Sequence, residues 1–96
     1  MSPMDAVAAR LKRNPDLHIL HATSDLIALE FTKQGKHHQG RVTRRATIGP
    51  NAQETITIQL DGNLKPYFVY SGGLRNAMGE HVSVEDFSAH VAELFR

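Results

Sequence analysis

Apolar and polar residues alternate with a period of about two from residue 16 to residue 70 of the chain. Because successive side chains of a strand point to opposite faces, this alternation predicts strands that each bury one face. The expected strands are Leu17–His21, Leu26–Thr32, Arg41–Ile48, Glu54–Leu60 and Tyr67–Tyr70. Short turn-forming segments rich in Gly, Pro, Asn and Asp separate them, so we predict about five strands in an antiparallel meander.

The chain changes to a helical period at both ends of this region. Ser2 and Pro3 suit the N-cap and the first helical position, and Pro15 ends the first helix. Ser83 is the expected N-cap of a second helix with an apolar stripe. These patterns predict an α+β fold: an N-terminal helix, a sheet of about five strands, and a C-terminal helix packed on one face of the sheet.

The apolar stripes of the strands and of the C-terminal helix have only each other as partners, which predicts one core. Its expected members are Ile27, Leu29, Phe31, Ile56, Ile58, Phe68, Phe87, Val91 and Leu94. One of Tyr67 and Tyr70 must point inward. The segment 71–79 has three glycines and no period, so we expect a loop that crosses the sheet to reach the final helix.

Length and composition limit the architecture to one small domain. The chain has 96 residues, too few for two independent cores, so we expect a single domain over residues 1–96. No apolar run is long enough to span a membrane, and the first residues lack the pattern of a signal peptide. We therefore expect a cytoplasmic protein that does not contact membranes. With no cysteine, it has neither disulfides nor thiolate chemistry.

The formal net charge of +1 conceals an uneven distribution of charge. Residues 31–53 contain five basic residues and no acidic one, whereas residues 76–95 contain four acidic residues and no Lys or Arg. On the strand at 41–48, alternation places Arg41 and Arg45 together with Thr43 on an entirely polar face. Guanidinium groups on a solvent-facing hairpin suit contact with phosphate.

Our first hypothesis is therefore a small non-enzymatic module that contacts nucleic-acid phosphates through a basic β-hairpin. The candidate binding residues are Lys33, Lys36, Arg41 and Arg45, joined by Arg10 and Arg13 if the first helix packs beside the hairpin. The alternative structural interpretation is a solvated edge strand, on which basic residues merely prevent pairing with another sheet.

A second hypothesis is a protein-interaction module, such as a small inhibitor or adaptor of a phage or another mobile element. It would present the basic hairpin or the acidic C-terminal helix to a partner of opposite charge. A homodimer through a free sheet edge is compatible with either hypothesis.

A weak metal-binding or enzymatic role is the third hypothesis. It depends on His90, which lies at helical spacing from Asp86 and Glu93. His18 and His21 lie three apart on a strand and are expected on opposite faces, where they could not share an ion. No P-loop or nucleophile-elbow motif is present, so we assign no catalytic residue, no metal and no cofactor, and expect a non-enzyme.

Known nucleic-acid-binding families give no assignment from sequence. The chain contains no Trp and 6% aromatic residues, which argues against a stacking platform of the RNA-recognition-motif type. The order of helix, strands and helix resembles the double-stranded RNA-binding domain in outline. The final helix is acidic at Glu85, Asp86 and Glu93, whereas that family requires a basic one, so no family is assigned.

Overall fold

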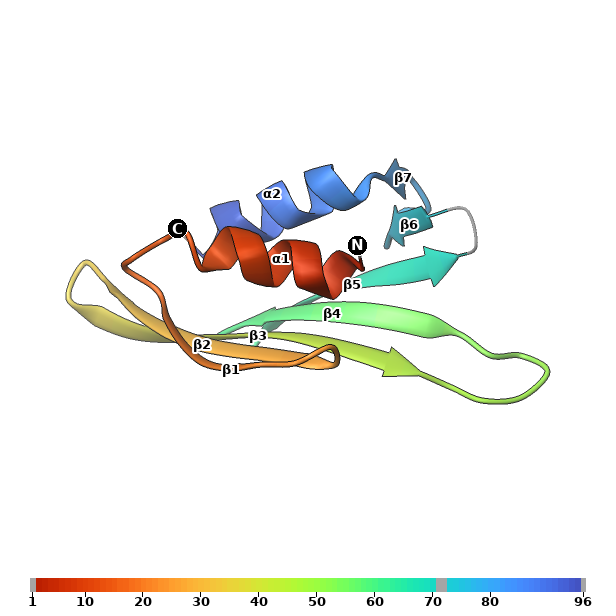
Figure 1. Cartoon of the computed structure of the whole chain (residues 1–96), viewed down its shortest axis with the longest axis horizontal. Helices are drawn as coiled ribbons and strands as arrows, with labels where there is room; N and C mark the ends of the chain where they lie inside the picture. Colours follow the sequence, from red (N-terminus) through yellow and green to blue (C-terminus); the bar gives the residue numbers. More distant parts are fainter. Residues whose placement is uncertain (1, 71–72, 96) are drawn as a thin grey trace.

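The structure is a computed structural model that describes residues 2–70 and 73–95 (Figure 1). Helix α1 (Pro3–Leu11) precedes the sheet and helix α2 (Val84–Leu94) follows it. The strands between them are β1 (His18–Ala22), β2 (Leu26–Lys33), β3 (Lys36–Ala46), β4 (Glu54–Leu60), β5 (Asn63–Tyr70), β6 (Gly73–Asn76) and β7 (His81–Val82). All are antiparallel neighbours in sequence order, so the predicted α+β meander is confirmed, with seven strands in place of about five.

The molecule has two layers, because both helices lie side by side on the same face of the sheet (Figure 1). Helix α2 reaches the sheet through its aromatic residues: Phe87 meets Tyr67 edge to face at 4.8 Å, and the C-capping Phe95 lies near Phe31. No described helix covers the other face. Strands β1 and β7 form the two edges of the sheet, and dimerisation through an edge stays a prediction.

The hydrophobic core lies between the sheet and the helices, as predicted. Its fully or nearly buried members are Met4, Val7, Leu11, Leu17, Ile27, Leu29, Phe31, Val42, Ile56, Ile58, Tyr67, Leu74, Phe87, Val91 and Phe95. Leu94 is partly buried against them. The placement of Phe68 in the core was wrong, because its register partner is Thr55, on the face away from the helices. Tyr67 takes the inward position opposite Ile56.

The expected loop at residues 71–79 was wrong for residues 73–76, which form a strand. Strand β6 pairs with β5, and the short strand β7 pairs with β6. The side-chain oxygen of Asn76 closes their turn by accepting the backbone N–H of Met78 and of Glu80, each at 3.0 Å. Strands this short show no recognisable alternation in sequence. Leu74 is the fully buried residue of β6. Ser71 and Gly72 lie outside the described residues.

Both helix starts follow from their capping residues. The Ser2 hydroxyl accepts the Asp5 backbone N–H at 3.2 Å, and the Ser83 hydroxyl accepts that of Asp86 at 3.0 Å. The predicted caps are therefore confirmed. Within residues 2–70 and 73–95, no helix has both the length and the apolar character that a membrane crossing requires.

The C-terminal end of α2 packs against Gly40 on β3. A Cβ at this position would stand 2.5 Å from Cε1 of Phe95 and 3.1 Å from a methyl carbon of Leu29. The Phe95 ring, which is fully buried, therefore lies against the bare backbone of β3. This contact ties the helical layer to the strand that carries Arg41.

Candidate functional site

Strand β3 lies inside the sheet, between β2 and β4, and its two faces differ in chemistry. Val42 is buried under the helices, whereas Arg41 and Arg45 are exposed on the opposite face. The register places Arg41 between Ala28 and Gln59. Four residues along a strand separate the two arginine Cα atoms by about 13 Å. The predicted polar row of Arg41, Thr43 and Arg45 is confirmed.

Arg44, between these two arginines in sequence, serves a structural role. Its Nη1 donates to Asp25 Oδ1 at 2.8 Å, and its Nε donates to Glu54. The hydrogen bonds that Arg44 donates to Glu54 and, second, to Asp25 raise the pKa of Arg44 above its ordinary value. By contrast, within the described part of the chain neither Arg41 nor Arg45 has a carboxylate at ion-pair distance. These two guanidinium groups are available to an external anion.

The exposed side of the sheet around these arginines combines polar, apolar and aromatic side chains. We call this surface the open face and define it by the outward residues of β3 to β6: His37, Gln39, Arg41, Thr43, Arg45, Thr55, Thr57, Gln59, Leu64, Pro66, Phe68, Tyr70 and Arg75. The Arg75 guanidinium lies over the Tyr70 ring, 5.6 Å from its centroid, and donates to the carbonyl of Gly79 at 2.9 Å.

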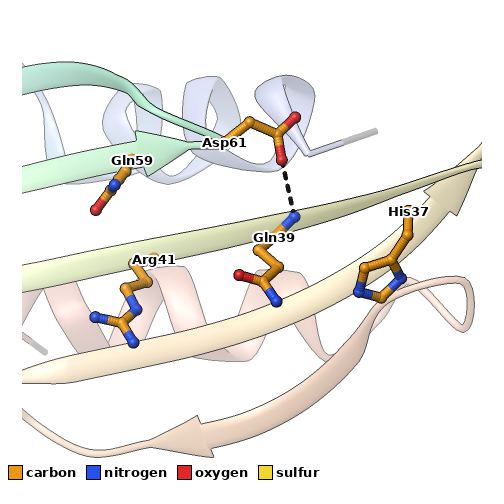
Figure 2. Close-up of a pocket in the computed structure, with 5 residues that line it drawn as sticks. All are labelled: His37, Gln39, Arg41, Gln59 and Asp61. Atoms are coloured by element: carbon orange, nitrogen blue, oxygen red, sulfur yellow. Dashed lines mark hydrogen bonds between the residues drawn. The ribbon is translucent and has the colours of Figure 1, made fainter.

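One end of the open face is hollowed. Figure 2 shows Arg41, Gln39 and His37 following one another along β3, with Gln59 on the adjacent strand and Asp61 after it. These residues line a hollow of about 320 Å³. Polar side chains predominate in this hollow, so it suits small polar groups better than an apolar ligand.

Asp61, at the rim of this hollow, is engaged by the protein itself. Its Oδ1 accepts the backbone N–H of Gln39 at 3.0 Å, and its Oδ2 lies 2.6 Å from Nδ1 of His38. The hydrogen bond with His38, followed by that from Gln39, lowers the pKa of the Asp61 carboxyl. The His38 ring in turn stacks on Phe31 at 5.2 Å. This acid therefore links the β4–β5 turn to β3.

The six candidate residues do not form one surface. Arg41 and Arg45 share the open face, whereas Lys33 and Lys36 are cross-strand partners at the tip of the β2–β3 hairpin. By parity along their strands, both lysines belong to the face that carries Phe31 and not to the face of Arg41. Arg10 lies on α1 and Arg13 just after it, in the helical layer behind the sheet (Figure 1). Helix α1 packs beside α2 and buries Met4, Val7 and Leu11 in the core, on the side of the sheet opposite Arg41.

Three side chains of the open face, Phe68, Tyr70 and Arg75, were not among the candidate residues. For Phe68 a usable indication existed, because the two-residue turn at residues 61–62 pairs Leu60 with Asn63. Counting outward along both strands then pairs Thr55 with Phe68 and places the ring on the open face. No comparable indication existed for Arg75, because β6 itself was not predicted.

The histidines do not gather into a metal site in the part of the chain that the structure describes. The expected opposite orientation of His18 and His21 was wrong. A register shift between Ile19 and His21 pairs His18 with Glu30 and His21 with Ala28, which places both histidines on one face. On this face His37 Nε2 lies 3.2 Å from Glu30 Oε2, so the carboxylate already has a partner.

Comparisons with known proteins add no assignment: no family model, no curated protein and no solved structure matches the chain.

Proposed function

We propose that the protein is a non-enzymatic module that binds nucleic acid by contacting phosphates with its open face. The observation that carries this proposal is the contrast along β3: Arg44 has two carboxylate partners, while Arg41 and Arg45 face solvent with none among the described residues. A guanidinium presents parallel N–H donors that match phosphate oxygens. The edge-strand interpretation does not apply, because β3 has a neighbour on each side.

The distribution of acidic groups also favours the open face as the side that binds a polyanion. Glu85, Asp86 and Glu93 lie on α2, in the layer behind the sheet. On the open side, Glu30 and Asp61 are near the Gln39 end of β3, and each has a histidine partner. Asp25 and Glu54, at the Arg45 end of β3, are both paired with Arg44, so the approach of a polyanion to Arg45 and Arg41 is favoured.

Charge reversal on the open face tests the proposal. The variant is Arg41→Glu with Arg45→Glu, and the matched control is Lys12→Glu with Arg13→Glu, which changes the net charge equally in the helical layer. Binding of a labelled oligonucleotide is measured by fluorescence anisotropy from ~50 mM salt upward. We expect the open-face variant to lose affinity and to flatten the slope of log affinity against log salt by about one unit per arginine.

The control variant should keep the slope of the wild type, and circular dichroism should show both variants folded, because surface substitutions usually change stability by about 0.5 kcal/mol. Equal losses in the two variants would contradict the open face as the site. Absence of any binding by the wild type at ~50 mM salt would overturn the proposal. It would leave the protein-interaction hypothesis, under which the same reversal should release a protein partner.

A further inference from the structure

Two aromatic rings stand on the open face at alternate positions of one strand. Phe68 and Tyr70 point away from the helices, while Val69 between them packs against the core. Tyr70 is 54% exposed and Phe68 is half-buried. The rings of Phe31 and Tyr67, in contrast, make their contacts inside the core. Burial therefore does not account for the two outward rings.

Cations flank both rings. The register continues from Arg45 through Thr55 to Phe68 and then to Arg75. A strand spacing of about 4.8 Å places the backbone of Phe68 one strand from Arg75 and about 10 Å from Arg45. The Arg75 guanidinium, held by the Gly79 carbonyl, lies over the Tyr70 ring. Basic and aromatic groups thus occupy the same end of the open face.

Only short side chains separate the arginines from the rings on the open face. Strand β4 separates β3 from β5, and its outward residues there are Thr55 and Thr57. Both side chains are short, so a ligand held at Arg45 can extend across β4 to Phe68. Because the backbones of Arg45 and Phe68 are about 10 Å apart, one ligand can contact both only if its charged group and its planar group are covalently connected but lie side by side across the sheet.

From this juxtaposition we infer that the open face selects single-stranded over duplex nucleic acid, with phosphates on Arg41 and Arg45 and bases stacked on Phe68 and Tyr70. The inference rests on the proposed function and adds the class of nucleic acid. An unpaired base can lay its face on a ring, whereas the bases of a duplex are already stacked on each other. An acidic peptide would satisfy the arginines and leave the rings unused.

Substitution of the rings tests the inference. Phe68→Leu and Tyr70→Leu remove the rings and keep apolar side chains, and Leu20→Ala is the control, because Leu20 is an exposed apolar residue of β1, outside the open face. The probes are a thymidylate oligomer of about 12 nucleotides, within the range of known single-strand sites, and a duplex of the same length. Affinity for each probe is measured against salt.

We expect the wild type to prefer the single strand. Each ring substitution should weaken single-strand binding by about fivefold or more, should barely affect duplex binding, and should leave the salt slope unchanged. The Leu20→Ala control should bind as the wild type does. Equal affinity of the wild type for both probes, or ring variants that bind the single strand normally, would overturn this inference while phosphate binding by Arg41 and Arg45 stands. Failure to bind either probe would instead remove the proposed function.

Tyrosine fluorescence gives a second measurement that is independent of affinity. The chain has two tyrosines and no tryptophan, so Tyr67→Phe leaves Tyr70 as the sole emitter. A base stacked on its ring should quench this emission when the single strand is added. Unchanged emission at saturation would exclude Tyr70 from the stacking surface.

Discussion

The packing of Phe95 against Gly40 permits a quantitative test of how the helical layer is held against β3. In Gly40→Ala the new methyl group would stand 2.5 Å from Cε1 and 2.9 Å from Cζ of Phe95, both inside normal contact distance. The ring is fully buried, with Phe31 edge to face at a centroid distance of 6.3 Å, so it cannot yield without disturbing the core.

The expected magnitude combines two opposing effects. Inserting a carbon into a well-packed core costs about 1–3 kcal/mol, while replacing Gly by Ala inside a strand recovers about 0.5–1 kcal/mol of backbone entropy. Because the closest approach is only 2.5 Å, we take the upper half of this cost, about 2–3 kcal/mol, and expect Gly40→Ala to lower the free energy of unfolding by about 1–2.5 kcal/mol. Urea unfolding followed by circular dichroism measures this change, and an unaltered m-value would show that the unfolded state is the same.

The partner of the clash can be identified with a double-mutant cycle. Phe95→Leu shortens the side chain above Gly40, so Gly40→Ala should cost less in that background, with a coupling energy of about 0.5–3 kcal/mol. The packing of this ring against Gly40 would be refuted if Gly40→Ala were as stable as the wild type. It would also be refuted if the effects of Gly40→Ala and Phe95→Leu on the free energy of unfolding were additive in the double variant.

Two further predictions concern the core and the β4–β5 turn. Ile58→Ala, deep in the sheet, should cost about 2–5 kcal/mol, and an unchanged urea midpoint would contradict the core described above. The lowered pKa of Asp61 means that its pairing with His38 stabilises the fold above the unfolded pKa of about 3.9 and is lost as pH falls below it. Asp61→Asn, whose side chain tolerates the positive φ of this position, should lose less stability on acidification than the wild type; equal losses would argue against the contribution of this pair.

The central part of the fold could be predicted because its alternation is clear. In β4, Ile56 and Ile58 alternate with threonines, and in β3 Val42 lies between the polar residues Arg41 and Thr43, so the period itself assigns the faces. The run from Tyr67 to Tyr70 is apolar and aromatic throughout. With no polar residue to mark the solvent side, composition could not decide between Tyr67 and Phe68 as the buried ring.

Other features depend on geometry that residue types do not encode. The shift that places His18 and His21 on one face comes from a bulge, which breaks the parity on which the expectation relied. Strands β6 and β7 are too short for a period and follow glycines. Arg10 and Arg13 are separated from Arg41 because α1 packs beside α2 on the opposite face of the sheet, which the order of charges along the chain does not reveal.

The most direct test of the open face as a nucleic-acid site is an NMR titration of the ¹⁵N-labelled protein with an unlabelled oligonucleotide, first single-stranded and then duplex, at ~50 mM salt where backbone electrostatics are strong. Backbone amide signals should shift around Arg41 and Arg45 on β3 and around Phe68 on β5, while the signals of α1 and α2 stay in place. Shifts centred on the helices, or no shifts with either oligonucleotide, would contradict the account.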